Sequence, residues 1–281
     1  MAFDSFRDFV NKLETEGELR RISAPVATEL EITEIAEREM KKPGGGQALL
    51  FEQPTVNGKL SPIPLAINTY GSEKRMAMVL GRDSVEDAAA ELNKLVKAKP
   101  PSTLGETFKL LGTALDLRHA KPKKVKSGPC KEVVHLFDES REASVESPST
   151  FNPQLSTLLN FPIQQCWPQD AGRFLTLPCV VTHDPDTGDR NLGLYRMQVF
   201  DGQTTALHWQ LQKVAARHGR RYYERGERMP VSVFLGGDPV YAFCASAPLP
   251  DGLDELLLAG WLRKKSVPLV KCETNDLEVP A

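Results

Sequence analysis

The segment Asn191-Leu-Gly-Leu-Tyr-Arg-Met-Gln-Val-Phe200 predicts the returning strand of a β-hairpin. Turn-forming residues fill 183–190 just before it, and an apolar strand precedes these residues. Asn191 and Arg196 would face opposite sides of a regular strand, because their positions differ by an odd number. For both to reach one ligand, the strand must bulge or begin after Asn191, and Gly193 is the natural place for this irregularity.

Two side chains near this hairpin allow more than one interpretation. Arg196 stands in an otherwise apolar strand and needs a carboxylate, a phosphate or water as its partner. On an edge strand it would simply face solvent. Trp209, beside His208, is either a platform for a flat ring or a core residue. From composition alone, a position in the core is favoured.

Asp254 and Glu255 begin a predicted short helix over 254–262. Acidic residues in the first turn are favoured by the helix dipole, so both could serve only to cap the helix. Glu255 could instead supply an oxygen to a hard cation, to which Asn191 would add an amide oxygen. Two ligands so far apart in the sequence do not form a motif by themselves.

The remaining pattern predicts an α/β (α+β) protein in two parts. Residues 1–120 alternate helices with short strands and predict a small N-terminal α/β domain. Residues 121–281 contain short strands separated by Gly/Pro turns, which are typical of a β-barrel or sandwich. The basic segment 118–126 near the boundary is a solvated linker or a phosphate-binding patch, and the linker is favoured because no aromatic residues interleave with the charges.

The individual elements follow from periodicity and turn signals. Helices are expected at 3–13, 30–40, 84–98, 104–117, 213–218 and 254–262. Strands are expected at 18–23, 47–51, 62–67, 132–137, 176–182, 191–200, 229–235, 240–244 and 269–281. Asn57-Gly58 and Asp201-Gly202 are expected to form tight turns.

Composition narrows the class of protein. The chain has 281 residues, with 35 Lys+Arg against 37 Asp+Glu and a net charge of −2. This balance argues against general electrostatic binding to nucleic acid or to an anionic membrane. The five cysteines are an odd number without a CxxC pair, so neither a disulfide framework nor a thiolate zinc site is predicted. No export signal or spanning run is evident, and a cytoplasmic location is expected.

Three other kinds of site are rejected. Gly44-Gly-Gly46 lacks the lysine of a P-loop and the spacing of a dinucleotide fingerprint. No serine lies in a Gly-x-Ser-x-Gly motif. Cys166 beside Trp167 is interpreted as a buried structural thiol.

Several blocks together resemble the UbiD-type decarboxylases. The signature hairpin is represented by Asn191-Leu-Gly-Leu-Tyr-Arg-Met-Gln-Val, Leu207-His-Trp-Gln and Ala215-Ala-Arg-His218. The N-terminus and the blocks Phe234-Leu-Gly-Gly-Asp-Pro239 and Val270 to Ala281 extend the resemblance over the whole chain. The family uses prenylated FMN to remove CO2 reversibly from aromatic and α,β-unsaturated acids. The resemblance therefore implies that residues 121–281 form a split β-barrel flavin-binding domain.

The resemblance also implies roles for individual residues. Asn191 and Glu255 would bind a divalent ion, typically Mn2+, that bridges to the cofactor phosphate, and K+ is an optional further cation. Arg196 would be the catalytic residue that holds the substrate carboxylate. Residues expected to contact the cofactor are Leu194, Tyr195, Arg196, His208, Trp209, Gln210, Lys213 and Val214.

Two departures from the family pattern stand out. Gln212 occupies the position where a metal-proximal histidine is expected, and its amide oxygen would be a weaker ligand. The family's acid/base carboxylates lie downstream of the block that ends at Ala281, and Glu273, Asp276 and Glu278 belong to a different block. The 281 residues alone are therefore expected to bind the cofactor weakly and to decarboxylate poorly.

Three functional hypotheses follow. The first is a decarboxylase acting on a small aromatic or unsaturated carboxylic acid, for example a hydroxybenzoate-type or polyprenylated precursor in quinone synthesis. The second is a non-catalytic flavin-binding remnant or accessory subunit, and the third is a subunit that docks a partner through an exposed barrel face. Expected partners are a flavin prenyltransferase that supplies the cofactor and, in full-length relatives, further copies of the chain. Peripheral membrane association is expected only for a polyprenylated substrate.

Overall fold

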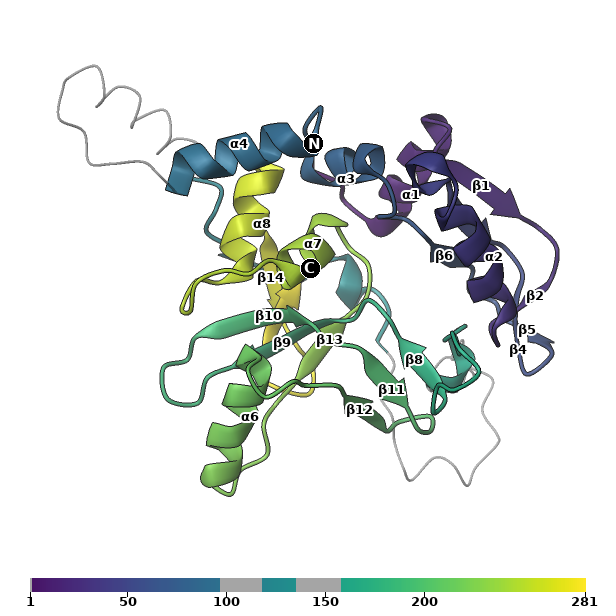
Figure 1. The fold of residues 1–281 in the computed structure, drawn as a ribbon. Coiled ribbons are helices and arrows are strands. Elements are labelled where there is room, and N and C mark those ends of the chain that lie inside the picture. Colours follow the sequence, from purple (N-terminus) through teal and green to yellow (C-terminus); the bar gives the residue numbers. More distant parts are fainter. Residues whose placement is uncertain (1, 97–117, 135–157) are drawn as a thin grey trace, which may run out of the picture.

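The computed structural model describes residues 2–96, 118–134 and 158–281 and has mixed α/β architecture, as predicted. Its described strands form five three-stranded sheets, and they do not close into a barrel. The N-terminal helices and strands lie on one side of the molecule, and the β8–β13 strands lie below them (Figure 1). The predicted helix at 104–117 lies outside the described residues.

The N-terminal part agrees with the expected alternation of elements. Helix α1 begins after Ser5, whose hydroxyl accepts the Asp8 backbone N–H at 3.1 Å, and it buries Phe9 and Leu13. Asn57 and Gly58 adopt positive φ between two paired strands, which confirms the predicted turn. The elements are α1 (Phe6–Thr15), β1 (Leu19–Ile22), β2 (Val26–Ala27), α2 (Glu31–Met40), η1 (Pro43–Gly45), β3 (Ala48–Phe51), β4 (Pro54–Val56), β5 (Lys59–Leu60), β6 (Leu65–Ile67), α3 (Glu73–Leu80) and α4 (Val85–Val96).

The glycine run at 44–46 has a packing role. Gly45 and Gly46 have φ of 83° and 56°. A Cβ on Gly45 would lie 1.8 Å from the carbonyl oxygen of Gly71, and one on Gly46 would lie 2.2 Å from that of Glu39. Only glycine permits both the backbone conformation and the close approach, so the run serves the fold.

The C-terminal part carries three of the sheets, with strand orders β10-β9-β13, β12-β11-β8 and β15-β14-β7. Strand β7 lies within the basic segment that was predicted to be a linker, and it pairs in parallel with β14. The elements are β7 (Lys123–Lys124), η2 (Pro129–Lys131), η5 (Leu158–Asn160), β8 (Arg173–Leu175), β9 (Cys179–His183), β10 (Arg190–Leu194), β11 (Met197–Val199), β12 (Thr205–Leu207), α6 (Val214–Glu224), β13 (Ser232–Phe234), α7 (Val240–Ser246), α8 (Glu255–Arg263), β14 (Pro268–Lys271) and β15 (Glu278–Pro280).

One strand prediction in this part is wrong, and another is wrong over the residues that the structure describes. The segment predicted as a strand at 240–244 is helix α7, which buries Val240, Tyr241, Cys244 and Ala245. That spacing places the buried residues on one helical face, and a short apolar run does not distinguish the two periods well. Residues 132–134 are not in a strand, and the rest of the segment predicted at 132–137 lies outside the described residues.

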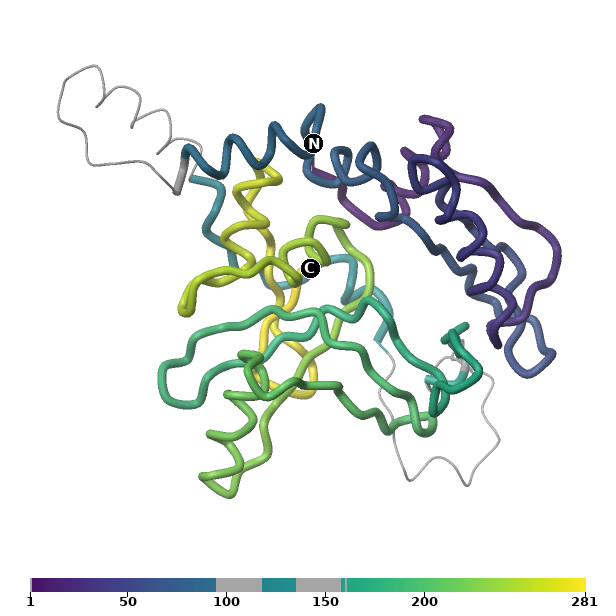
Figure 2. Tube along the Cα trace, in the orientation of Figure 1, coloured from purple at the N-terminus to yellow at the C-terminus, as the bar shows by residue number. Residues whose placement is uncertain are grey.

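The largest hydrophobic cluster draws on both predicted parts of the chain. Phe9 and Leu13 of α1 belong to the same buried cluster as Val181, Leu192 and Leu256. The trace shows the N-terminal segment passing close to α3 and α4, above α7 and α8 (Figure 2). The predicted parts therefore share one core.

A buried ion pair strengthens this connection. Asp238 accepts hydrogen bonds from the Phe3 backbone N–H at 2.9 Å and from Nε of Arg263 at 2.8 Å. The side chains of Asp238 and Arg263 are 1% and 5% exposed.

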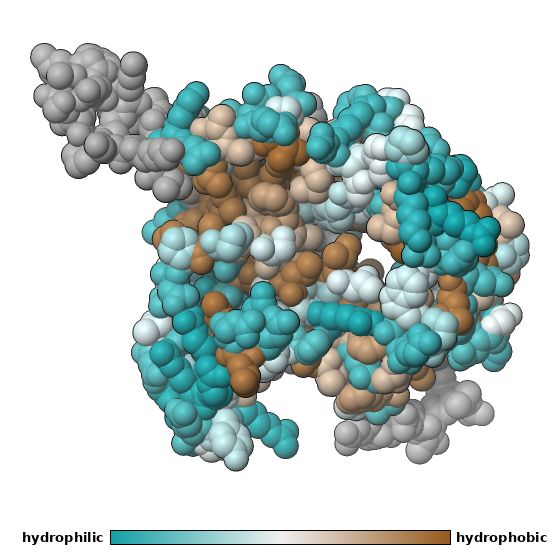
Figure 3. All heavy atoms as spheres, viewed as in Figure 1, coloured by the Kyte–Doolittle hydropathy of each residue, from teal (hydrophilic) through white to brown (hydrophobic). Residues whose placement is uncertain are grey.

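Apolar side chains also gather on the face formed by α7 and α8 (Figure 3). No helix in the described ranges combines the length and the apolar character needed to cross a bilayer.

Candidate functional site

The predicted strand over 191–200 is divided into β10 and β11, which belong to different sheets. Asn191 and Gly193 pair regularly with β9, so the irregularity expected at Gly193 falls instead at Tyr195 and Arg196. A Cβ on Gly193 would lie 2.3–2.4 Å from ring atoms of Tyr195. Gly193 therefore provides the space into which the Tyr195 ring folds back.

The Tyr195 hydroxyl connects β10 to helix α6. It accepts hydrogen bonds from Nδ2 of Asn191 at 3.4 Å and from the Ala215 backbone N–H at 3.5 Å. Asn191 is 4% exposed and uses its amide nitrogen for this contact. Its carbonyl oxygen, the atom that could bind a metal, is not involved in the contact.

Glu255 lies in the first turn of α8, directly after its N-cap residue. Asp254 caps the helix by accepting the Leu256 backbone N–H at 2.9 Å. One carboxylate oxygen of Glu255 accepts the Leu192 backbone N–H at 2.8 Å, which places Glu255 beside β10. Burial raises the pKa of Glu255 from its ordinary value of 4.5 to about 7, and the Leu192 N–H only partly offsets this effect. A cation bound beside this carboxylate would stabilise its ionised form.

Asn191 and Glu255 line the same hollow, of about 210 Å³. Helix α6 forms another wall through Val214, Arg217 and Arg221. The two arginines are one helical turn apart, so both can face the hollow. Cationic and anionic groups therefore meet around a space near the amino end of α6.

Carboxylates from surrounding loops hold both arginines. Arg217 makes two hydrogen bonds to Asp251, of 2.7 and 2.8 Å. Arg221 donates to Asp184, and this contact lowers the pKa of Asp184 to about 2. Neither arginine was predicted to be a site residue, although their spacing on an amphipathic helix was a usable signal.

Buried His218 lines the same hollow. Its Nδ1 lies 3.0 Å from the Thr182 hydroxyl. Burial lowers the pKa of His218, which keeps the ring neutral near pH 7. The contact joins α6 to β9.

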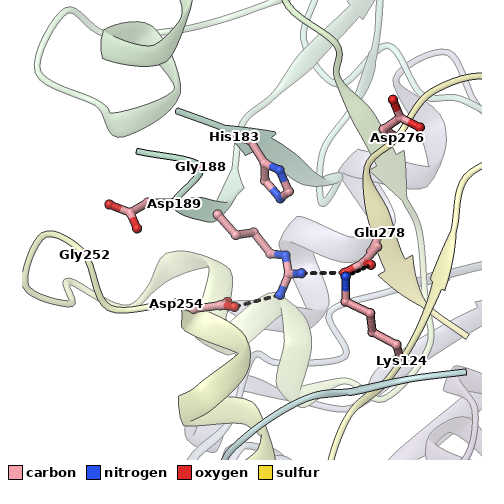
Figure 4. A pocket seen from close by; sticks show the side chains of 9 residues that line it. Lys124, His183, Gly188, Asp189, Gly252, Asp254, Asp276 and Glu278 are labelled. Carbon is pink, nitrogen blue, oxygen red and sulfur yellow. Dashed lines mark hydrogen bonds and ion pairs between the residues drawn. The ribbon is translucent and has the colours of Figure 1, made fainter. Parts of the chain in front are cut away.

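A second hollow, of about 410 Å³, adjoins the first and shares Asp189, Arg190 and Gly252 with it. Arg190 donates to Asp254 at 2.7 Å and to Glu278 at 2.9 Å. Figure 4 marks these two contacts with dashed lines, one ending at Asp254 and the other at Glu278. Arg190 therefore stands at the boundary between the two hollows.

The predicted catalytic residue Arg196 lies outside the linings of both hollows. Its Nη2 donates to Asp170 at 2.8 Å, and its guanidinium carbon lies 3.7 Å from the centroid of the Phe174 ring. The structure thus brings Asn191 and Glu255 together but places the Arg196 guanidinium in a separate cluster. Asp170 and Phe174 were not singled out from the sequence.

The residues predicted to contact the cofactor differ in exposure. His208, Gln210 and Lys213 are exposed, whereas Tyr195 is buried; Leu194, Trp209 and Val214 are intermediate. Trp209 packs edge-on against Tyr195, with ring centroids 6.3 Å apart. Its buried Nε1 has no hydrogen-bond partner among the described residues. Trp209 thus packs with the core and retains an unused donor.

The metal-ligand candidates are only partly assembled. Gln212 is exposed and donates to Gln210 at 3.0 Å, and it does not line the hollow of Asn191 and Glu255. Among residues 2–96, 118–134 and 158–281, no group of three His, Cys, Asp or Glu side chains could hold a metal ion. The carboxylate of Glu255 and the amide oxygen of Asn191 are nevertheless hard donors, which suit a divalent cation that takes further ligands from a bound molecule.

Comparison with known sequences identifies relatives over the whole chain. An uncharacterized protein of Archaeoglobus fulgidus is 41% identical over 282 residues, covering 100% of this chain and 53% of the relative. An uncharacterized protein of Aquifex aeolicus is also 41% identical, covering 99% and 53%. The chain thus spans about half the length of these relatives.

Solved structures show the same fold. The closed form of the vanillic acid decarboxylase of Sedimentibacter hydroxybenzoicus is 23% identical, with a TM-score of 0.74, covering 100% of this chain and 53% of that one. The UbiD-class enzyme HmfF of Pelotomaculum thermopropionicum, in complex with FMN, is 23% identical, with a TM-score of 0.72, covering 98% and 52%.

Two family models cover most of the chain. The 3-octaprenyl-4-hydroxybenzoate carboxy-lyase N-terminal domain matches residues 10–95. The 3-octaprenyl-4-hydroxybenzoate carboxy-lyase Rift-related domain matches residues 123–281, which is more than half of the chain and includes the hairpin, α6 and α8. This chain accordingly belongs to the UbiD family of carboxy-lyases.

Proposed function

We propose that this chain is the cofactor-binding part of a prenylated-FMN-dependent decarboxylase acting on an aromatic or α,β-unsaturated acid. A hydroxybenzoate-type precursor of a quinone is the substrate class that the family description suggests. The observation that carries the proposal is the shared hollow of Asn191 and Glu255, faced by Arg217 and Arg221 of α6. Family membership supports the class of reaction.

In this proposal the hollow would receive the phosphate end of the cofactor. Asn191 and Glu255 would hold Mn2+, and the ion would offset the repulsion between Glu255 and a phosphate. The first-turn N–H groups of α6 and its dipole favour an anion, and Lys213 directly precedes the helix. K+ would serve as a further cation.

The flavin ring would lie against the hairpin. Leu194, Tyr195, His208 and Gln210 would provide its surroundings, and the unused Nε1–H of Trp209 is available as a donor. Bound prenylated FMN would supply the electron sink that decarboxylation requires. Arg196 would hold and orient the substrate carboxylate through its guanidinium.

The proposal extends to the surroundings of the site. A flavin prenyltransferase would supply the cofactor, and a polyprenylated substrate would bring the protein to a membrane surface. The full-length protein would work in the cytoplasm as a homo-oligomer, with acid/base carboxylates from sequence beyond residue 281. We divide the chain functionally into residues 1–120 and the flavin-binding domain at 121–281.

Co-production of the 281-residue chain with a flavin prenyltransferase tests flavin binding. Because weak binding is expected, we expect visible absorbance to stay with the protein when excess cofactor is present during purification, and Asn191→Ala together with Glu255→Ala should abolish it. Protein that remains colourless at saturating cofactor would contradict the proposal.

Release of CO2 from a panel of hydroxybenzoates then tests catalysis. CO2 release that disappears in Arg196→Ala would support the proposal that the protein is a decarboxylase. Firm flavin binding without turnover, in the 281 residues and in the full-length protein, would identify a flavin-binding accessory subunit, the alternative function.

A further inference from the structure

The guanidinium of Arg196 is engaged on two sides. Its Nη2 donates to Oδ1 of Asp170 at 2.8 Å, and the Phe174 ring covers one of its faces, with 3.7 Å between the guanidinium carbon and the ring centroid. The Arg196 side chain remains 39% exposed, whereas that of Asp170 is 12% exposed. The structure thus shows a guanidinium that is accessible to solvent and already bound to a carboxylate.

Asp170 is held in place from its other oxygen. The backbone N–H of Trp167 donates to Oδ2 of Asp170 at 3.2 Å. Burial alone would raise the pKa of Asp170, but the bonds from Arg196 and Trp167 lower it below its ordinary value. The carboxylate is therefore an anion near neutral pH, and a short loop fixes its position.

The hydrogen bond between Asp170 and Arg196 can be replaced by one to another carboxylate. Asp170 binds Arg196 through one guanidinium nitrogen, whereas a free carboxylate can take two parallel hydrogen bonds from the same group. Partly exposed ion pairs contribute little to stability, because water competes with them and two side chains must be ordered. A substrate carboxylate can therefore compete with Asp170 for the guanidinium.

We propose that Asp170 is an internal carboxylate that occupies the position on Arg196 taken by the carboxylate of the substrate, so that substrate binding displaces it. This inference rests on the proposed role of Arg196. Asp170 then sets the apparent affinity for acids, since binding requires the fraction of the protein in which Arg196 is free. The adjoining Phe174 ring suits a flat aryl or conjugated acid.

Titration calorimetry of the flavin-free chain with benzoate tests the displacement. We expect Asp170→Asn to bind benzoate about fivefold more tightly than the unmodified chain, because the competing anion is gone. Arg196→Gln should abolish binding, and neutral benzamide should not distinguish the variants. The control is Asp4→Asn, which likewise removes one ion pair and one negative charge, here at the exposed Asp4–Lys265 contact.

The calorimetry distinguishes two roles for Asp170: it competes with the ligand for Arg196, or it positions Arg196 to bind the ligand. Weaker binding in Asp170→Asn would show that Asp170 positions Arg196 for the ligand, and it would overturn the proposal. Unchanged affinity, no binding by either protein, or equal tightening in Asp4→Asn would also overturn it.

A second measurement uses the unmodified chain. Trp167 is 49% exposed and lies on the loop that holds Asp170, so displacement of Asp170 should alter its fluorescence. We expect a benzoate-dependent change that is lost in Trp167→Phe, and its absence would contradict the displacement. Both measurements omit flavin, so their failure is distinguishable from failure of cofactor binding or CO2 release.

Discussion

The guanidinium of Arg190 contacts the carboxylate of Asp254 at 2.7 Å, and each residue directly precedes a proposed metal ligand, Asn191 or Glu255. The contact joins β10 to α8 at the level of the site. A second bond, of 2.9 Å, joins Arg190 to Glu278 of β15. These side chains are only 14–21% exposed, so the network is shielded from solvent. Arg190 therefore links the segments that carry Asn191 and Glu255, in addition to the Leu192–Glu255 bond.

Replacement of Arg190 by Gln should weaken metal binding. Substitutions of residues that orient metal ligands typically reduce affinity by 10–100-fold, and we expect about tenfold for Mn2+. Paramagnetic resonance of free Mn2+ during a titration measures the affinity. Arg21→Gln, which removes exposed ion pairs with Glu14 and Glu52, is the control and should leave affinity unchanged. Equal affinities in Arg190→Gln and the unmodified chain would contradict this positioning role.

Stability should depend on pH through Glu255. Its pKa is raised from 4.5 to about 7, so its contribution is full below pH 4.5 and is lost as the pH rises through 7. Relative to Glu255→Gln, the unfolding free energy of the unmodified chain should fall by roughly 2 kcal/mol between pH 4.5 and 7.5. Urea denaturation at both values measures this, and a difference independent of pH would contradict it.

Metal should reverse this trend. Because a cation binds the ionised carboxylate, saturating Mn2+ should stabilise the unmodified chain more at pH 7.5 than at pH 5. Glu255→Gln should show little stabilisation at either pH. Thermal unfolding with and without Mn2+ measures the effect, and equal stabilisation of both proteins would place the metal elsewhere.

Gly193→Ala should destabilise the hairpin, because the added Cβ would lie 2.3 Å from the Tyr195 ring. Overpacking of this kind typically costs about 1–3 kcal/mol. In a Tyr195→Ala background the same substitution should have a much smaller effect, because the ring is absent. A double-mutant cycle of urea denaturation tests the coupling, and additive effects would show that the ring is not the obstacle.

Asp238→Asn should be among the more destabilising substitutions at the surface of contact between the N-terminal segment and α8. It leaves the Arg263 guanidinium buried without its counter-ion, a change that typically costs about 3–5 kcal/mol. The matched control is Asp4→Asn, which breaks the exposed Asp4–Lys265 pair and should cost under about 1 kcal/mol. Similar unfolding free energies for the two variants would mean that burial does not strengthen the first contact.

Local signals in the sequence predicted much of the fold. The apolar spacing from Phe3 to Leu13 located α1, and Asn57-Gly58 located a hairpin turn. Helix α7 was missed because Val240 to Cys244 is too short for its period to be read with certainty. Its burial against other elements, rather than its own composition, decides its conformation.

The site was predicted less completely, because its contacts are long-range. Family resemblance pointed to Asn191 and Glu255, and the structure places both on one hollow. No local pattern shows that Asp170 binds Arg196 or that Arg190 binds Asp254, since such pairs form only when distant segments fold together. These ion pairs account for much of the part of the site that was not predicted from the sequence.

The shared hydrophobic cluster has a consequence for modular exchange. A cut between the two regions that match the family models would leave Phe9 and Leu13 on one fragment and Val181 and Leu256 on the other, each without its partners. Recombination between relatives should therefore succeed only when both regions come from the same parent. The two regions match separate family models, but their side chains pack into one hydrophobic cluster.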